Sequence, residues 1–401
     1  MLELKVVVVG VLIALHSIAA YKPDDPGCTP SPYQVFWNQY GPVFGALDVT
    51  RWDITAGNLT QTGVNCDQPN CTAWTQGLWP TIGDNGEVFN GGVPQAANLT
   101  AHLENIRATM GGWLPDPEWA GNAVFDFEDW TPVWAQNNNP SWWHGVRYQN
   151  LSIALVGAAH PTWNSSQILA AAQEEFEAAA VAFFVQTLQL CRALRPHAAW
   201  GFYGLPASAP GPCVANGPDP SPQCGYRNPA AGPALRAEND AIAAVWAASS
   251  GIFPSIYIPA GHNTSDWFSR NADYIAGMAE EAARLASTNA PPGSQVPVRP
   301  FAWNYYHDGE SLLLPADMAA SINAPLPAGA DGVVLWGSPT PDQNSEMTTY
   351  VNSTLGPLAL EAVTTDCACA AVNCSGHGAC TSPTACRCFP GYSGPRCATG
   401  A

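Results

Sequence analysis

The sequence predicts an α/β protein in which a parallel (β/α) barrel is followed by a small disulfide-rich module. Short apolar runs and helix-like segments alternate between residues 33 and 362, which is the pattern of a parallel sheet with covering helices. Acidic and aromatic residues stand where the predicted strands end, and the chemistry of such barrels lies at those ends. Six closely spaced cysteines follow from Cys369 to Cys397. A doubly wound sheet is the alternative, but no Gly-rich phosphate-binding motif follows a predicted strand.

Length and composition narrow the class of protein further. The 401 residues are enough for one large barrel and a small module. Apolar residues make up 47% of the chain, charged residues only 11%, and the formal net charge is −18. This excludes nucleic acid as a partner, because phosphates require lysine and arginine. It also gives no basic patch for anionic membranes, and it makes a polyanionic substrate difficult to attract.

Residues 1–20 are predicted to be a cleaved signal peptide. Lys5 precedes the apolar run Val6–Leu15, and the small residues Ser17, Ala19 and Ala20 offer a cleavage site. The run is short for a membrane-spanning helix, so an uncleaved anchor is the less favoured alternative. No later stretch is expected to be long and apolar enough to cross a membrane. The mature chain is therefore predicted to be secreted, or to reside in another compartment of the secretory pathway such as the lysosome.

Cysteines and sequons agree with that location. Thirteen cysteines fit an oxidising compartment. Eight N-x-S/T sequons are present, two of them at Asn70 and Asn373. The predicted glycosylation sites are the other six, Asn58, Asn98, Asn150, Asn164, Asn263 and Asn352.

The predicted elements follow from local patterns of apolar residues. The strands are short apolar runs, and they span Gln34–Trp37, Ala123–Phe125, Ala199–Tyr203, Pro254–Ile258, Val298–Tyr305 and Gly332–Trp336. The helices have apolar residues at helical spacing or are rich in Ala and Glu, and they span Pro94–Met110, Ser166–Leu194, Ala234–Ser249, Asp273–Ser287 and Pro315–Asn323.

The strand ending at Asp126 carries the residues best suited to catalysis. Asp126 and Glu128 are two positions apart, so in an extended chain they share a face. Two neighbouring carboxylates repel each other, and one then holds a proton near neutral pH, as a general acid must. A solvated acidic turn is the alternative interpretation. Trp130 and Trp134 nearby could stack on a sugar or simply fill the core.

The run Phe125–Trp134, FDFEDWTPVW, resembles the D-x-E-x-W-x-P-x-W signature of the animal and venom hyaluronidases. Further matches occur in the family's order, and the resemblance covers most of residues 33 to 362. They are GGVPQ from Gly91, LRP from Leu194, WGFYG from Trp200, FPSIY from Phe253, GVVLW from Gly332 and TLGP from Thr354. The resemblance implies a distorted (β/α) barrel of the TIM type and a glycoside hydrolase without metal or cofactor.

The resemblance also implies a role for each site residue. Glu128 is the proton donor and later the base, and Asp126 orients the substrate's acetamido group, whose oxygen attacks the anomeric carbon. Tyr203, Tyr257 and Trp336 surround that group. By their positions alone, Trp130 beside the acids and Tyr306 at a predicted strand end are further substrate-binding candidates. The spacing agrees independently: positions i and i+2 lie about 6.6–6.8 Å apart on one wall. They cannot easily flank a sugar from both sides, as the two carboxylates of ordinary glycosidases do.

One departure from the family concerns charge. Thr131 stands where the mammalian enzymes carry an arginine beside the acid motif. The groove would then lack a cation that could meet the carboxylate of a uronic acid.

After residue 365 the spacing C-x4-C-x5-C-x5-C-x-C-x8-C resembles an EGF-like module. That resemblance implies the disulfides Cys369–Cys380, Cys374–Cys386 and Cys388–Cys397, whereas spacing alone leaves fifteen connectivities open. A zinc site is disfavoured by the secretory context. The predicted domains are thus a barrel over 21–365 and a module over 366–398, whose partner would be another protein. We expect the barrel to act without residues 367–401.

The remaining cysteines are assigned less completely. Cys213–Cys224 matches a loop disulfide of the hyaluronidases, and Cys66–Cys71 could close a local one. Cys28, Cys191 and Cys367 are left over, and because thirteen is odd, at least one thiol is free or pairs between chains.

The function predicted from these residues is a secreted, retaining endo-β-N-acetylhexosaminidase. It would cleave β-1,4 bonds of hyaluronan or chondroitin-like glycosaminoglycans by substrate-assisted catalysis. The alternatives are a non-catalytic glycan-binding or adhesion protein on the same scaffold, and a hydrolase of an uncharged N-acetylglucosamine polymer. The acids and tyrosines favour an enzyme, because a binding protein needs no proton donor.

Overall fold

The computed structural model describes most of the chain between Tyr33 and Gly400. The described ranges are 33–39, 47–63, 77–83, 85–139, 145–207, 225–259, 265–290, 294–307, 311–337, 343–382, 385–388 and 391–400. The predicted signal peptide, Asn263 and the predicted disulfides Cys66–Cys71 and Cys213–Cys224 lie outside these residues.

The pairings of the parallel strands connect them into a ring. One sheet has the order β2-β1-β9-β8, and its strands span Ile54–Ala56, Gln34–Gln39, Gly332–Gly337 and Phe301–Trp303. A second sheet has the order β3-β6-β7, over Leu59–Gly63, Asn122–Asp126 and Ala199–Phe202. Parallel bridges from Tyr203 to Phe253 and from Ser255 to Phe301 connect β7 to β8.

Two residues separate β2 from β3, so this segment pairs with β1 at one end and with β6 at the other. The ring therefore closes, as in a TIM-type barrel.

The interior of the ring is filled by one side chain from each of several strands. Phe36, Val124, Phe253, Phe301 and Val334 form a cluster, each at most 1% exposed. This layer follows from the period of two in a strand, which turns every second residue inward.

A glycine and an arginine complete the packing of the ring. A Cβ atom on Gly201 would lie 2.2 Å from the carbonyl oxygen of Gly251, so glycine is required for the close approach of β7. At the amino-terminal end of the strands, the guanidinium of Arg299 lies 4.6 Å over the ring of Phe36 and binds Asn122. A partly buried cation thereby covers the base of the barrel.

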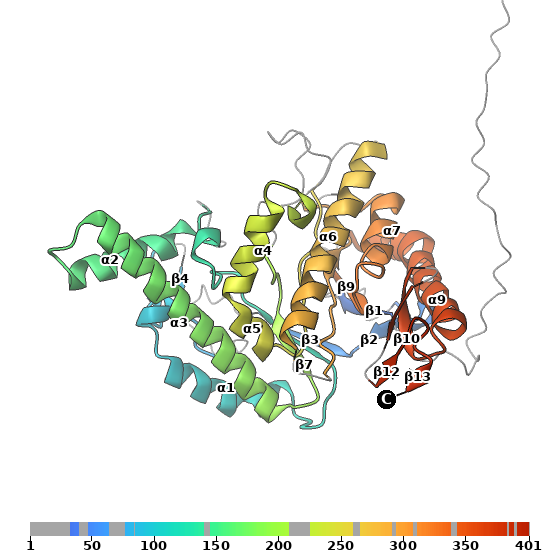
Figure 1. Ribbon diagram of the computed structural model, residues 1–401, viewed down its shortest axis with the longest axis horizontal. Coiled ribbons are helices and arrows are strands. Elements are labelled where there is room, and N and C mark those ends of the chain that lie inside the picture. The colour runs from blue at the N-terminus through green and yellow to red at the C-terminus, as the bar shows by residue number, and fades with distance from the viewer. Residues whose placement is uncertain are drawn as a thin grey trace, which may run out of the picture.

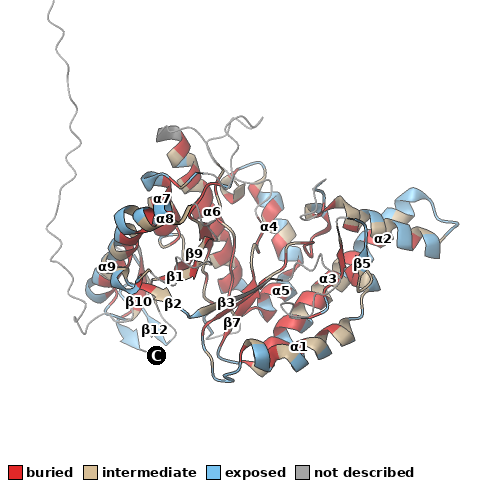
Figure 2. Cartoon of the chain, turned by 180° about the vertical axis from the view of Figure 1, so that it is seen from behind, coloured by how far each residue is buried: buried red, intermediate tan, exposed pale blue. Residues whose placement is uncertain are grey.

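Helices cover the outside of the ring (Figure 1). They are α1 (Leu99–Trp113), α2 (Val146–Ala159), α3 (Ser165–Leu194), α4 (Gly232–Ala241), α5 (Ala243–Ala248), α6 (Ser265–Asn289), α7 (Pro315–Asn323), α8 (Asn344–Tyr350) and α9 (Gly356–Asn373). Helix α3 begins with a capping box, in which the side chains of Asn164 and Gln167 each accept a backbone N–H. Helix α2 and the start of α3 project from the barrel, and their tip is exposed (Figure 2).

The predicted elements correspond to observed ones with few exceptions. The strand predicted over Pro254–Ile258 is reduced to isolated bridges, and the helix predicted over Ala234–Ser249 is broken at Ile242 between α4 and α5. Strands β2 and β3 and helices α2, α8 and α9 were not predicted, nor was the hairpin of β4 (Thr81–Ile82) and β5 (Val88–Phe89).

The expectation that no later stretch could span a membrane was wrong by length and composition. The helical stretch Asn344–Asn373, α8 and α9 joined by the π-helix Val351–Leu355, contains an 18-residue window with a mean hydropathy of 1.3. However, 44% of the residues in its most apolar window are buried, and Val351, Leu355 and Ala359 pack into the core at helical spacing. Its apolar face therefore meets the barrel.

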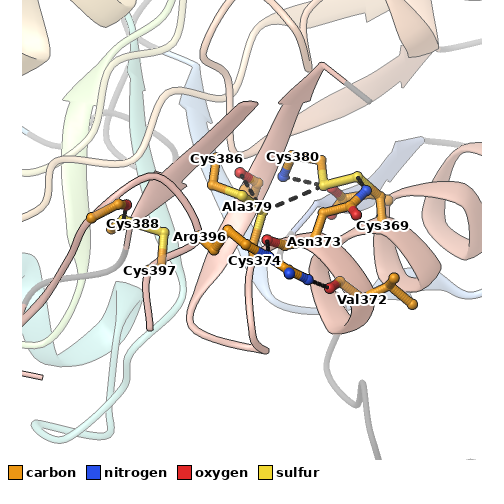
Figure 3. Close-up of a disulfide and its surroundings, with 12 residues drawn as sticks. Cys369, Val372, Asn373, Cys374, Ala379, Cys380, Cys386, Cys388, Arg396 and Cys397 are labelled. Carbon is orange, nitrogen blue, oxygen red and sulfur yellow. Dashed lines mark hydrogen bonds between the residues drawn. A yellow bond between two sulfur atoms is a disulfide. The ribbon is translucent and has the colours of Figure 1, made fainter. Parts of the chain in front are cut away.

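The small module has the three predicted disulfides (Figure 3). Cys369–Cys380, Cys374–Cys386 and Cys388–Cys397 connect the end of α9 to two hairpins. These consist of β10 (Gly378–Ser382) with β11 (Ala385–Cys388), and β12 (Tyr392–Ser393) with β13 (Thr399–Gly400). Among the remaining described cysteines, Cys367 is also disulfide-bonded, whereas Cys191 is a buried free thiol.

The module and the barrel share a helix and a buried carboxylate. The predicted boundary after residue 365 falls inside α9. Asp366, 1% exposed, accepts the backbone N–H of Tyr33 at 3.0 Å and that of Cys380 at 3.3 Å. Arg387 of β11 binds Asp331, which directly precedes β9, at 2.9 Å. Because these contacts involve the starts of β1 and β9, the module packs on the base of the barrel.

Candidate active site

The two predicted acids lie at the mouth of the barrel. Asp126 is the last residue of β6, and Glu128 follows two positions later. Both are partly exposed, whereas Phe125, Phe127 and Asp129 between and beside them are buried. This alternation turns both acids to the open side of the strand end, as the sequence predicts.

The environment of Glu128 keeps its carboxyl group protonated. The pKa of Glu128 is raised to about 9, mainly by burial, then by the negative charge of Asp126 and a hydrogen bond between the two side chains, with a smaller contribution from Asp129. A glutamic acid protonated at neutral pH beside an aspartate is suited to general acid catalysis.

The chain next to Glu128 is held by hydrogen bonds on the buried side of the wall. The carboxylate of Asp129 accepts the hydroxyl of Tyr148 at 2.7 Å, and that hydroxyl accepts the backbone N–H of Ile82 at 3.3 Å. The indole of Trp130 donates to the carbonyl of Pro80 at 2.7 Å. Both residues after the acid are thus connected to the 80–82 segment, which limits the movement of Glu128.

Two tyrosines stand beside the acids. The hydroxyl of Tyr203, just beyond β7, donates to Ser255 at 3.2 Å. The rings of Tyr203 and Tyr257 lie 5.9 Å apart, and their hydroxyls are hydrogen-bonded to each other. Burial, above all, raises the pKa of each tyrosine, and the charges of Asp126 and Glu128 add to the shift. The structure therefore brings both predicted tyrosines to the predicted acids.

An aromatic wall continues from Tyr257 around the mouth. Trp336 stacks on Tyr257 at 6.0 Å, and Trp303 lies 5.3 Å from Trp336 and 5.6 Å from Tyr257. All three side chains are partly exposed. Trp303 was not predicted as a site residue, although it occupies the end of β8 in register with Trp336 on β9. Its position at a strand end was the signal that could have identified it.

The predicted role of Trp130 was wrong. Its side chain is 1% exposed and packs against Phe127, Phe176 and Phe184. Trp134, 8% exposed, likewise packs against Phe176. Both tryptophans belong to the core between β6 and α3, so neither can stack on a sugar.

Tyr306 and Thr131 also differ from expectation. The hydroxyl of Tyr306 donates to the buried Asp317 of α7 at 2.6 Å, which ties it to the outer helix layer. Thr131 is 2% exposed, and its hydroxyl and backbone N–H bind Gln136 and Asn137. It faces the protein interior, and its side chain takes no part in the groove.

The described residues contain no group of three or more His, Cys, Asp and Glu side chains that could hold a metal ion.

Comparison with known proteins places this geometry in a family. A family model described as hyaluronidase matches residues 45–398. The chain belongs to the hyaluronidase family. It is 35% identical to human hyaluronidase-1 over 343 residues, which cover 84% of this chain and 74% of that protein. It is 30% identical to human hyaluronidase-2 over 388 residues, covering 93% and 78%.

A solved member of the hyaluronidase family has a similar fold. The structure of bee venom hyaluronidase in complex with a hyaluronic acid tetramer matches with a TM-score of 0.66 and 27% sequence identity. The match covers 82% of this chain and 99% of that one. The chain is thus a glycoside hydrolase with a TIM-type barrel and a small C-terminal disulfide-rich region.

Proposed function

We propose that this protein is a secreted, retaining endo-β-N-acetylhexosaminidase that cleaves β-1,4 bonds of hyaluronan. The observation that supports this best is the protonated Glu128, hydrogen-bonded to Asp126 beside the hydroxyls of Tyr203 and Tyr257. The substrate is inferred from the relatives, because they are named hyaluronidases and one is a complex with hyaluronic acid.

The acids support substrate-assisted chemistry. Glu128 gives its proton to the glycosidic oxygen while the acetamido oxygen of the same sugar attacks the anomeric carbon, and the glycosidic bond breaks. Asp126 accepts the acetamido N–H and stabilises the charge that develops there. The Glu128 carboxylate then takes a proton from water, which attacks the anomeric carbon and reopens the cyclic intermediate with net retention.

An enzyme nucleophile on the opposite wall has no support among the described residues. The carboxylates whose charges act on Tyr203 and Tyr257 are Asp126 and Glu128, which follow one strand. Tyr257, Trp303 and Trp336 form the described part of the wall beyond them. A double displacement requires a second carboxyl group about 5–5.5 Å from the acid and on the other side of the bond.

Secretion and cleavage of chondroitin are further parts of the proposal. Residues 1–20 have the pattern of a signal peptide, and the module depends on disulfides. Chondroitin has the same alternation of uronic acid and N-acetylhexosamine as hyaluronan, so the same acid pair can serve both polymers.

The test is hydrolysis of hyaluronan oligosaccharides by the purified protein, followed by proton NMR. We expect new reducing ends whose first-formed anomer is β, and inhibition by a thiazoline analogue of N-acetylglucosamine. A first-formed α-anomer, or a sugar ester on either carboxylate, would exclude the substrate-assisted mechanism. Binding of the oligosaccharide without turnover would favour a non-catalytic glycan-binding protein. Turnover confined to an uncharged N-acetylglucosamine polymer would favour a hydrolase of that polymer.

A further inference from the structure

The substrate proposed above carries one carboxylate in each disaccharide, so the groove needs a group that recognises it. Position 131, where an arginine stands in the mammalian enzymes, is a buried threonine turned inward. This side chain supplies no cation to the groove.

The described arginines are either engaged with protein groups or located on the outer helices. Ten of the twelve in the sequence bind protein groups, either carboxylates, side-chain amides or backbone carbonyls: Arg51, Arg147, Arg192, Arg195, Arg227, Arg236, Arg284, Arg299, Arg387 and Arg396. Arg107 is exposed on the outer helix α1. Arg270 is partly buried on α6 and is engaged as well.

A histidine stands on the aromatic wall instead. His307 follows β8, and its backbone N–H donates to the carbonyl of Ile258 at 2.9 Å, which fixes it next to the Tyr257 strand end. Its ring lies 6.3 Å from the ring of Tyr257 and 6.3 Å from that of Trp303, in edge-on orientations. His307 is exposed, whereas Tyr257 and Trp303 are partly exposed. A nitrogen donor is thus presented to solvent at the edge of the wall.

We propose that His307 and Trp303 form a subsite for the uronic acid of the substrate. The imidazole donates a hydrogen bond to the carboxylate, and the indole packs against the apolar face of the sugar ring. The inference rests on the proposed function, since it concerns the sugar next to the N-acetylhexosamine held at the acids. It assigns recognition of charge to one exposed side chain in a protein of net charge −18.

Hyaluronan and carboxyl-reduced hyaluronan, in which each carboxylate has become a primary alcohol, are the matched substrates for the test. We expect His307→Ala to lower kcat/KM for hyaluronan about ten- to a hundredfold, as loss of a hydrogen bond to a charged group does. The reduced polymer should change less than about threefold. His307→Arg should restore most of the activity on hyaluronan. His160→Ala is the control, because His160 also lies against a tryptophan, Trp163, but on the distant α2–α3 tip.

Equal losses on both polymers would mean that His307 acts through packing, and no loss on either would mean that it does not touch the substrate. A selective loss on hyaluronan with Arg270→Ala, but not with His307→Ala, would assign the cation to α6. Each of these results would overturn the proposal.

Calorimetric binding of the charged and the reduced tetrasaccharide to the Glu128→Gln variant separates the subsite from the chemistry. We expect His307→Ala in that background to weaken binding of the charged tetrasaccharide alone. If the wild type hydrolysed neither polymer but this selective loss appeared, the proposed function would fail and the subsite would stand. If the wild type hydrolysed hyaluronan but the two tetrasaccharides lost affinity equally, the subsite would fail and the function would stand.

Discussion

At the scale of single residues, the site is governed by the contrast between two carboxyl groups on one face. Asp126 and Glu128 are close enough for a hydrogen bond, and the burial of Glu128 decides that it keeps the proton. A group held in this state is poised for catalysis, but it opposes folding once the pH exceeds the pKa that it has in the unfolded chain.

Glu128→Gln should therefore abolish hydrolysis and stabilise the protein. Turnover should fall at least ~10²-fold, because the amide cannot donate a proton as an acid does. The folded-state pKa of Glu128 is raised from 4.5 to about 9, so the wild type loses stability as the pH rises from 4.5 towards 9. The variant lacks this loss, and its advantage in Tm should grow between pH 5 and pH 8. The exposed Glu104→Gln on α1 is the control; equal Tm shifts for both variants would contradict the assignment.

The pH dependence of kcat/KM reports the same proton. Activity requires protonated Glu128, so the alkaline limb should lie near pH 9 and not near pH 4.5. In Asp126→Asn the alkaline limb of the residual activity should shift to lower pH, because the negative charge that helps to raise the pKa of Glu128 is gone. The charged or titratable groups that act on the pair are Asp129, Tyr203 and Tyr257. An unchanged limb in Asp126→Asn would show that the two acids are not coupled.

At the scale of elements, helices α1 and α3 are joined by a buried polar pair. His102 is 0% exposed, and its Nδ1 accepts the backbone N–H of Leu78 at 3.0 Å. Its Nε2 lies 2.9 Å from the hydroxyl of Thr187, which itself donates to the carbonyl of Phe183. All polar atoms of the pair have partners, so the helices are held in one register as long as the imidazole stays neutral.

This pair should make the barrel sensitive to acid. Burial lowers the pKa of His102 from 6.5 to about 3, so its contribution to stability is full above pH 6.5 and is lost as the pH falls towards 3. We expect the free energy of unfolding of the wild type to fall by about 1.4 kcal/mol per pH unit in that range relative to His102→Gln. Urea unfolding between pH 4 and pH 7 measures this. His197→Gln is the control, because the side chain of His197 is 55% exposed. Its free energy of unfolding should have the same pH dependence as that of the wild type.

At the scale of the whole molecule, chemistry and module lie at opposite ends of the barrel. The acids are at the carboxyl ends of the strands, whereas Asp366 and Arg387 contact the residues just before β1 and β9. The sequence predicts a barrel that acts without the module, but the shared helix α9 argues that truncation also removes part of the barrel's support.

Substitutions at the junction should change stability and not catalysis. Asp366→Ala leaves two buried N–H groups without their acceptor and should cost about 2–4 kcal/mol of stability. Arg387→Ala breaks a more exposed ion pair and should cost at most about 1 kcal/mol. Chemical denaturation measures both, while kcat/KM of the folded variants should stay within about twofold of the wild type. A larger change in kcat/KM for Arg387→Ala would mean that the base communicates with the mouth.

Net charge predicts an unusual salt dependence. A chain with net charge −18 repels a polyanion at long range. Raising the salt concentration from about 10 to 150 mM shortens the Debye length from roughly 30 to 8 Å and weakens this repulsion. The kcat/KM for hyaluronan should therefore rise over that range. Carboxyl-reduced hyaluronan should show almost no change. Hyaluronan cleavage that is fastest at the lowest salt would reveal a basic surface that outweighs the net charge.

The sequence by itself determined most strands of the barrel, though not β2 or β3, and also the acid pair and the three module disulfides. These depend on local periodicity, on alternation along one strand, and on spacings that match known families. Tertiary structure decided the rest. Trp130 and Thr131 follow the acid motif in sequence, but both side chains are buried, because this part of the chain packs into the protein core. Trp303 and His307 come from the neighbouring β8 segment, about fifty residues further along the chain, and the parallel bridge between Ser255 and Phe301 brings them beside Tyr257. Local patterns show which side chains share a face, but which face becomes core and which becomes groove depends on the packing of the whole barrel.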